Sequence, residues 1–214
     1  SINLGNGMGS GGDAEGDRLS FIENLVGSRF ADLLLGDAGA NTLEGRNGND
    51  VLRGFAGNDR LFGGNGNDEL FGDFNSDFLA GGAGNDTISD GAGADTVFGE
   101  AGDDFVLAAA DGANDAYGGG AGFDLLSYAE AIADVVIDLV NGNASGSDIG
   151  TDAISGFERA VGGSGNDRLI GDAFSSLLGG NGGNDTLLGS AGNNSPWGGA
   201  GNDNLRRFSG AAVL

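Results

Sequence analysis

Aspartate recurs in this chain every nine residues, within a pattern that repeats with it. The clearest copy is Gly63-Gly64-Asn65-Gly66-Asn67-Asp68-Glu69-Leu70-Phe71, in which Asp stands sixth and Leu eighth. Eight copies follow one another without insertion from Gly36 to Leu107, and a looser copy precedes them from Gly27. The chain has no Cys and no His, so a column of carboxylates predicts chemistry with oxygen ligands. Position six reads Asp32, Asn41, Asp50, Asp59, Asp68, Asp77, Asp86, Asp95 and Asp104.

The spacing of these carboxylates favours calcium. If two nonapeptides make one coil, every second copy lies on the same edge. Carboxylates of such copies then lie about one strand spacing apart, roughly 4.8 Å, and repel one another unless a cation lies between them. The glycine loops also leave carbonyl oxygens without partners. Six to eight oxygen donors in a flexible geometry are typical of Ca²⁺, whereas Mg²⁺ requires a tight octahedron and keeps its waters.

The elements that would position these loops are very short strands. Position eight is aliphatic in nine consecutive copies. A strand of three residues cannot form a sheet alone, but parallel stacking would join such strands and bury their position-eight side chains in one continuous core. Glycine accounts for 47 of 214 residues. A period of nine with a single proline argues against collagen, and the regular aliphatic residues argue against a flexible linker.

Composition narrows the range of functions. Thirty-two acidic residues face nine basic ones, a formal net charge of −23, and every basic residue is Arg. Such a chain resists collapse without cations and lacks the basic surface that nucleic acid or anionic lipid requires. No stretch approaches the roughly 18 apolar residues of a membrane span, and Ser1 does not open a signal peptide. We therefore expect a soluble chain that is part of a longer protein.

The repeat divides the chain into four segments. The insertion of Ala108-Ala109 breaks the register, and weaker copies follow from Ala110 and Gly119 with Asp115 and Asp124 at position six. The pattern then stops until Gly162; within this gap we predict a strand at 134–139 and a polar turn region at 141–150. A shift of fifteen nonapeptides aligns 2–70 with 137–205 without gaps. We predict a strand-rich lead-in segment (1–26), a first roll (27–127), a strand-rich connector (128–161), and a shorter second roll with a C-terminal tail (162–214).

These nonapeptides resemble the RTX (repeats-in-toxin) family of secreted bacterial proteins, strongly over residues 27–127 and 162–206. The resemblance implies an all-β fold, a right-handed parallel β-roll (β-solenoid), here in two modules. It also implies that each Ca²⁺ lies between two loops that are two nonapeptides apart. The earlier loop would give the carbonyls of positions two and four and its Asp, and the later loop the carbonyls of positions one and three and its Asp.

Transferred to this sequence, the ligand pattern predicts seven sites. On one edge of the first roll they are Arg46, Gly48, Asp50, Gly63, Asn65 and Asp68; Gly64, Gly66, Asp68, Gly81, Ala83 and Asp86; and Gly82, Gly84, Asp86, Gly99, Ala101 and Asp104. On the other edge they are Phe55, Gly57, Asp59, Gly72, Phe74 and Asp77; and Asp73, Asn75, Asp77, Asp90, Ala92 and Asp95. In the second roll they are Gly163, Gly165, Asp167, Gly180, Gly182 and Asp185; and Asn181, Gly183, Asp185, Gly198, Ala200 and Asp203. Asp32 and Asp124 are further candidate ligands.

Some positions depart from the pattern. Asn41 and Ser176 occupy equivalent places in the two modules, so we expect no complete site at the first loop of that edge. Asn194 and Pro196 disrupt another loop, because proline cannot donate to a sheet ladder. We therefore expect the second roll to bind calcium on one edge only. Asp13, Asp17, Asp148 and Asp152 could form a further site or could cap turns, and Glu23 and Glu158 are interpreted as structural strand-edge residues rather than catalytic acids.

Three functions come into consideration. The first is a non-catalytic calcium-folding module of a larger extracellular protein, exported by the bacterial type I route that the resemblance implies. The second is a structural or adhesive surface or filament protein, assembled from such modules and in contact with itself or with cell-surface or matrix polysaccharide. The third is an enzyme, for which the sequence offers no catalytic constellation. The alternative to a calcium site is a glycine-rich solenoid whose Asp residues only cap turns.

Overall fold

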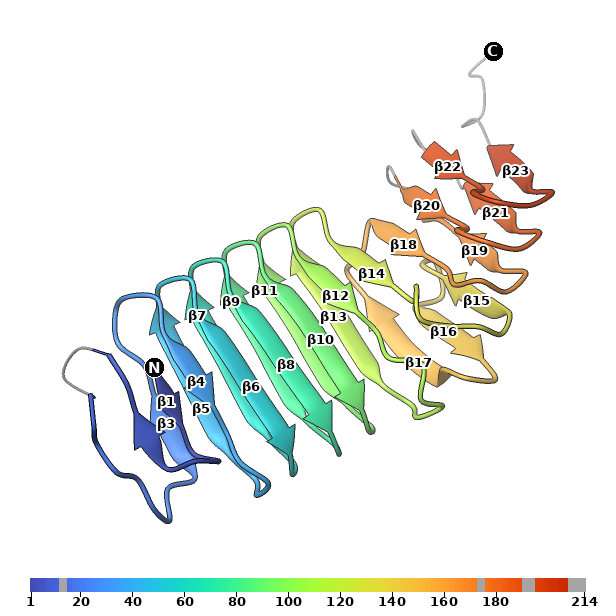
Figure 1. The fold of residues 1–214 in the computed structure, drawn as a ribbon. Coiled ribbons are helices and arrows are strands. Elements are labelled where there is room, and N and C mark those ends of the chain that lie inside the picture. The colour runs from blue at the N-terminus through green and yellow to red at the C-terminus, as the bar shows by residue number, and fades with distance from the viewer. Residues whose placement is uncertain (12–14, 173–175, 190–194, 208–214) are drawn as a thin grey trace.

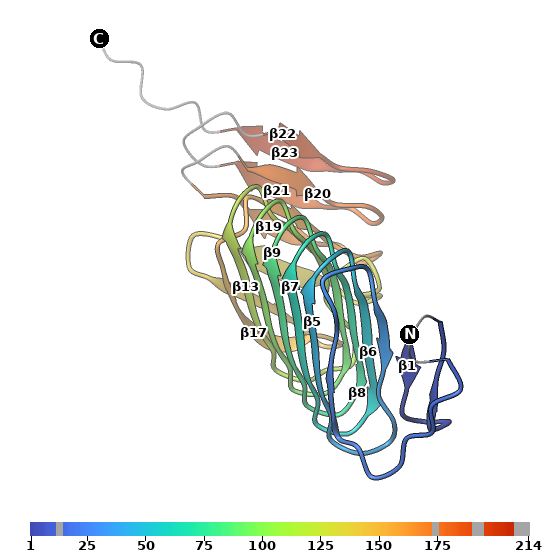
Figure 2. The ribbon, with the colours of Figure 1, turned by 90° about the vertical axis from the view of Figure 1, so that its left-hand side faces the viewer.

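The structure, a computed structural model, is a solenoid of short stacked strands (Figures 1 and 2). It describes residues 1–11, 15–172, 176–189 and 195–207, and all of its regular elements within these ranges are strands. The predicted all-β parallel β-roll is confirmed. None of the described elements is a helix long and apolar enough to cross a membrane.

Two sheets face each other along the whole stack. In the first, neighbouring strands follow the order β2 (Met8–Gly9), β1 (Ile2–Asn3), β4 (Leu33–Leu35), β6 (Val51–Ala56), β8 (Glu69–Phe74), β10 (Thr87–Ala92), β12 (Phe105–Leu107), β14 (Leu125–Ser127), β18 (Arg159–Val161), β20 (Leu177–Gly179) and β22 (Ser195–Trp197).

The second sheet contains the strands that alternate with these along the chain. Its order is β23 (Asn204–Arg207), β21 (Thr186–Gly189), β19 (Arg168–Ile170), β15 (Val135–Asp138), β16 (Asn143–Gly146), β17 (Gly150–Ser155), β13 (Ala116–Ala121), β11 (Thr96–Ala101), β9 (Phe78–Ala83), β7 (Arg60–Asn65), β5 (Thr42–Asn47) and β3 (Asn24–Val26).

The register follows the sequence period. Leu52 pairs with Leu70 in the first sheet and Leu61 with Leu79 in the second, so one turn takes two nonapeptides. Across the Ala108-Ala109 insertion one turn is longer by the two inserted residues, as in the pairing of Val97 with Tyr117. The extra residues lengthen that turn and leave the strands in register.

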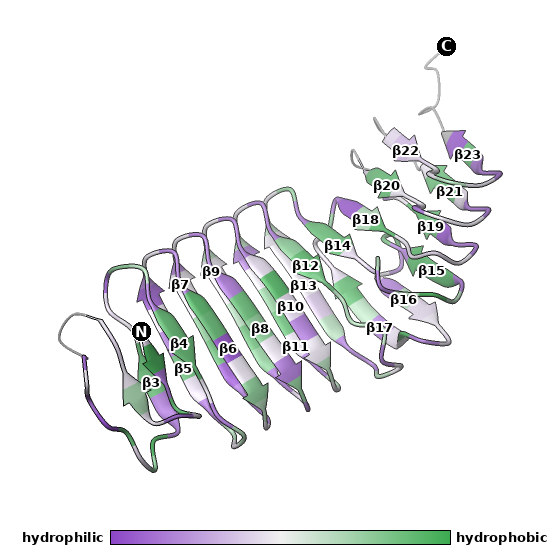
Figure 3. Ribbon diagram, in the orientation of Figure 1, coloured by the Kyte–Doolittle hydropathy of each residue, from purple (hydrophilic) through white to green (hydrophobic). Residues whose placement is uncertain are grey.

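The core is the predicted ladder of position-eight side chains. From Leu34 to Val106 every one of them is at most 1 % exposed, and Leu126, Leu169, Leu178 and Leu187 continue the column. Figure 3 shows the corresponding hydrophobic segments on successive strands, with more hydrophilic residues towards the loops. Because each layer contacts only its neighbours, the core is quasi-one-dimensional.

The rolls are joined by an antiparallel hairpin. The strand predicted at 134–139 is present as β15, but the region predicted as a polar turn contains β16, which pairs with both β15 and β17. Alternation of Asn143, Ala144 and Ser145 buries only Ala144, a pattern too short to be read as a strand from sequence. Strand β17 then pairs with β13, and β18 with β14, so both sheets run on from one roll to the next.

Candidate metal centre

The position-six carboxylates form a hydrogen-bonded ladder along both edges of the solenoid. In most of them one oxygen, Oδ1, accepts the backbone N–H of the residue at position six one turn earlier. Asp50 N donates to Asp68 Oδ1 at 2.7 Å, and Asp68 N donates to Asp86 Oδ1 at 2.8 Å. On the opposite edge Asp59 N donates to Asp77 Oδ1 at 2.7 Å. The same contact holds the carboxylates one strand spacing apart and fixes their orientation.

The second oxygen, Oδ2, is left without a partner. Within the described part of the chain, nine position-six carboxylates have a buried Oδ2 that no hydrogen-bond donor reaches, namely those of Asp50, Asp59, Asp68, Asp77, Asp86, Asp95, Asp104, Asp124 and Asp185. Burial raises the pKa of Asp77 to about 8 and those of Asp86 and Asp95 to about 7. A carboxylate buried in this way needs either a bound cation beside it or a proton that neutralises it.

Backbone conformation directs carbonyl groups towards these oxygens. In ten described loops the residues at positions two and four both have positive φ, as at Arg46 (80°) and Gly48 (126°). A Cβ on Gly64 or Gly66 would collide with the carbonyl oxygens of Arg46 and Gly48, so those two carbonyls point forward to the next loop. We call these ten loops the open loops; they begin at residues 45, 54, 63, 72, 81, 90, 99, 119, 180 and 198.

Carbonyls of the following loop point back into the same space. A Cβ on Gly45 would collide with both Asp50 Oδ2 and the carbonyl oxygen of Gly63. The carbonyl of Asn65 accepts the N–H of Gly48 at 2.9 Å and therefore also points back. The structure thus brings together all six donors of the first predicted site, including both carboxylates, in the interval between two loops.

The other predicted sites follow this arrangement to different degrees. The ladder bond and the unpartnered Oδ2 recur in the sets that begin at Gly64, Gly82, Asp73 and Asn181. In the set that begins at Phe55 the carboxylates are in place, but Gly57 N donates to the Asn75 side chain at 3.2 Å instead of a carbonyl. That set therefore keeps its two carboxylates but has a different loop contact.

Four of the described loops satisfy their position-six side chain internally, and we call them the self-bonded loops. The N–H of position two donates to that side chain: Ser28 to Asp32 Oδ2 (2.6 Å), Asp37 to Asn41 Oδ1 (2.8 Å), Gly163 to Asp167 Oδ2 (2.7 Å) and Asp172 to Ser176 Oγ (3.1 Å). In the predicted site that begins at Gly163, the carbonyl oxygen of Gly163 also accepts the N–H of Gly182 at 3.2 Å. These are the first two loops of each roll.

One complete donor set was not predicted. A Cβ on Gly120 or Gly122 would collide with the carbonyl oxygens of Glu100 and Gly102, and Gly102 N donates to the carbonyl of Ala121 at 2.9 Å. Asp104 N donates to Asp124 Oδ1 at 2.8 Å, so Asp124, predicted only as a single candidate ligand, shares an interval with Asp104 of the set that begins at Gly82. The signal was present in Gly119-Gly-Ala-Gly-Phe-Asp124, a full copy of the pattern that the Ala108-Ala109 insertion displaces from the regular spacing.

The connector supplies carboxylates of its own to the ladder. Glu158 Oε2 accepts Asp124 N at 2.9 Å, the bond that a position-six Asp makes elsewhere. Asp152 Oδ1 accepts Asp115 N at 3.0 Å, and its Oδ2 accepts the Tyr128 hydroxyl at 2.7 Å. Asp148 caps the N–H groups of Ile132 and Ala133, which lowers its pKa.

The remaining candidates lie apart from these sites. Asp17 is exposed at the N-terminal end and does not meet Asp148 or Asp152 in any described contact. Pro196 lies in β22 and pairs with Leu178. Asp13, Asn194 and the tail 208–214 lie outside the described residues.

Stacked parallel strands, paired carboxylates and convergent carbonyls define a calcium-binding parallel β-solenoid. Calcium fits this donor set because every ligand is an oxygen and the unpartnered carboxylates are buried. The RTX calcium-binding nonapeptide repeat (4 copies) matches residues 20–52, 35–70, 71–106, 152–173 and 179–206, more than half of the chain. The chain belongs to this family. No curated protein matches it in sequence.

Proposed function

We propose that this chain is a calcium-folded, non-catalytic module of a larger extracellular protein. The observation that carries the proposal is the row of nine buried Oδ2 atoms without partners among the described residues, most of them beside a carbonyl of the following turn. Without cations, this row and a net charge of −23 oppose the compact state. Ion binding and folding are then a single event.

This coupling would act as a switch between compartments. Calcium is scarce inside cells and millimolar outside, so the chain would remain unfolded before export and fold afterwards. Family membership supports export by the type I route, and the ligands at each predicted site would be the carbonyls and carboxylates described above. The exported parent protein would carry any catalytic or binding activity in other segments.

Circular dichroism during calcium titration tests the proposal. We expect a disordered spectrum with a chelator, a cooperative gain of β-structure as calcium is added, and reversal when the chelator is restored. Magnesium at the same concentration is the control and should produce little β-structure, because Mg²⁺ requires short bonds in a near-ideal octahedron and gives up its waters reluctantly, which does not suit a cage made only of loop carbonyls and carboxylates. A chelated chain that is already fully β would refute the coupling of folding to calcium.

A structural role for assembled modules is the second candidate. The connector joins the two rolls by continuous pairing of β13 with β17 and β14 with β18, which illustrates how one module can stack on another. A protein built of many such modules would be a long calcium-dependent rod suited to adhesion or to a surface layer, with polysaccharide or another copy as partner. Small-angle scattering would support this role if calcium produced elongated assemblies, and a strictly monomeric folded chain would argue against it.

A further inference from the structure

One loop departs from the pattern where the repeat register breaks. Position one is glycine in the other open loops, but in the loop 90–95 it is Asp90. The next loop on that edge, 110–115, follows the two-residue insertion and lies outside the family match. The interval between these two loops is therefore not an ordinary repeat site.

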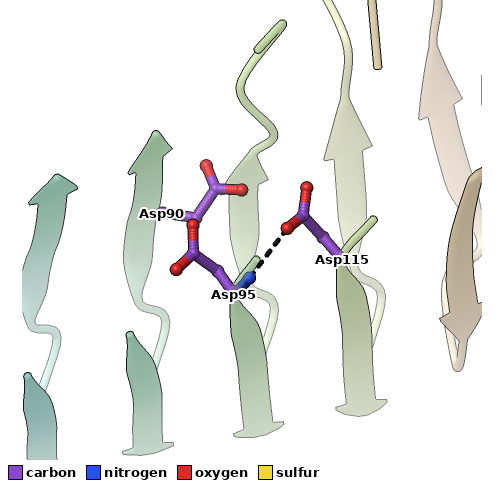
Figure 4. A group of neighbouring side chains, drawn as sticks. All are labelled: Asp90, Asp95 and Asp115. Atoms are coloured by element: carbon purple, nitrogen blue, oxygen red, sulfur yellow. Dashed lines mark hydrogen bonds between the residues drawn. The ribbon is translucent and has the colours of Figure 1, made fainter. Parts of the chain in front are cut away.

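The side chain of Asp90 enters this interval. Figure 4 shows the carboxylates of Asp90, Asp95 and Asp115 gathered from neighbouring turns, with Asp95 N donating to Asp115 Oδ1 at 2.8 Å. One carboxylate oxygen from each residue lies within 4.8 Å of those of the other two. The three residues are 0 %, 2 % and 5 % exposed, respectively. Ordinary intervals in the ladder bring only two position-six carboxylates together.

There are too few protons for the buried oxygens of this cluster. The Tyr117 hydroxyl contacts both Asp90 Oδ2 and Asp115 Oδ2, the latter at 3.0 Å, but a hydroxyl carries one proton and can donate to only one of them. Asp95 Oδ2 has no partner among the described residues. The two ion pairs found among the described residues, Arg46–Glu44 and Arg53–Asp73, involve none of these three carboxylates. At least two buried carboxylate oxygens of the cluster therefore have no donor among the described residues.

We propose that this cluster is an additional calcium site of a different composition, in which side chains replace loop carbonyls. Asp90, Asp95 and Asp115 supply three carboxylates, and the Tyr117 hydroxyl lies against two of them. Asp90 Oδ1 remains held by the N–H groups of Gly91 (2.9 Å) and Ala109 (3.1 Å), so its other oxygen is oriented towards the ion. The site ties the irregular turn at the insertion to the regular ladder, and it rests on the proposed calcium-dependent folding.

Tyrosine-sensitised terbium emission reads out this site in the full chain. Tb³⁺ replaces Ca²⁺ at oxygen sites and emits strongly when an excited aromatic side chain lies beside it. The chain has two tyrosines and one tryptophan, and the exposed Trp197 can be removed by Trp197→Phe as a background variant. In that background Asp90→Asn should abolish most of the emission. The matched control, Asp68→Asn in a regular loop with no tyrosine, should leave most of it.

Calcium stoichiometry by titration calorimetry supplies the second measurement. Asp90→Asn should bind one ion fewer than the parent chain. Asp90→Gly restores the residue found at position one elsewhere, so it should fold, and it should also bind one ion fewer. Unchanged emission and ion count in both variants would overturn the site, and a gain of one ion in Asp90→Gly would show that Asp90 blocks an ordinary site instead. If the parent chain itself shows no calcium-dependent β-structure, the proposed function has failed rather than this site.

Discussion

The self-bonded and open loops differ in bonding although their sequences can be almost identical. Residues 162–167 and 63–68 read Gly-Gly-Ser-Gly-Asn-Asp and Gly-Gly-Asn-Gly-Asn-Asp, and they differ only at the third position. Yet Asp167 Oδ2 accepts its own loop's N–H from Gly163, whereas Asp68 Oδ2 has no partner among the described residues. The context explains the difference: every open loop lies one turn after another nonapeptide loop, whereas no nonapeptide loop lies one turn before a self-bonded loop. The first loop on an edge of each roll therefore closes on itself, and the later described loops, 110–115 excepted, open towards their predecessor.

Substitution in the middle of the open ladder should have the largest effect. Asp68→Ala removes a buried carboxylate shared by two intervals. Each lost site forfeits about 2.7 kcal/mol of stability when calcium is at 100 times its dissociation constant, so the loss is about 5 kcal/mol. Urea unfolding in saturating calcium measures this value, and calorimetry should show two ions fewer. An ion count equal to that of the parent chain would mean that the open loops are not calcium sites.

A change in an open-loop backbone should have the next largest effect. Gly66 has φ of 129°, and a Cβ there would collide with the carbonyl oxygen of Gly48. Gly66→Ala should destabilise the calcium-bound chain by about 1–3 kcal/mol and weaken calcium binding. The control is Gly39→Ala in a self-bonded loop, where the nearest atom is Asp37 Oδ1 at 3.3 Å and φ is not positive. Thermal unfolding measures both variants. Equal losses of stability in Gly66→Ala and Gly39→Ala would contradict the distinction between open and self-bonded loops.

Acid should affect the chelated and the calcium-loaded chain in opposite directions. Burial raises the pKa of Asp77 to about 8 and that of Asp86 to about 7 in the folded chain, above the ordinary value of 3.8. The metal-free roll therefore binds more protons than the unfolded chain; its stability is greatest below about pH 4 and is lost as pH rises through about 7 to 8. With a chelator, β-structure measured by circular dichroism should increase from pH 8 to pH 5. With calcium, the midpoint of the titration should move to higher calcium as protons compete.

The smallest effect is expected in a self-bonded loop. Asp32 is only partly buried, and its Oδ2 accepts Ser28 N within the loop. Asp32→Ala should cost about 1 kcal/mol, the value of a lost cap, and leave the ion count unchanged. The matched variant is Asp68→Ala. The ratio of the unfolding free energies lost in the two variants measures how far self-bonded and open loops differ. Loss of an ion in Asp32→Ala would extend the calcium ladder to the first loop.

The regular part of the molecule was predictable because its constraints are local and periodic. The position-eight column predicted the core from Leu34 to Val106, and the position-six column predicted which carboxylates stack. The self-bonded loop 162–167 could not be distinguished from an open loop by sequence, since its own residues match the pattern and only the turn before it differs. The Asp104–Asp124 interval was hidden by the Ala108-Ala109 insertion. Asp90 and Tyr117 meet from turns on opposite sides of that insertion, a contact that no repeat predicts.

The Oδ1–amide ladder also bears on how the chain would respond to force. Each carboxylate belongs to one turn but accepts its hydrogen bond from the turn before, so successive turns are joined in series along the long axis. A pull on the two ends would load every joint equally, and the weakest joint would open first. Ions between the loops would stiffen each joint they occupy, so the extensibility of the column would vary with the calcium concentration around it. The turns that contain the self-bonded loops would be the first to separate from their neighbours under tension.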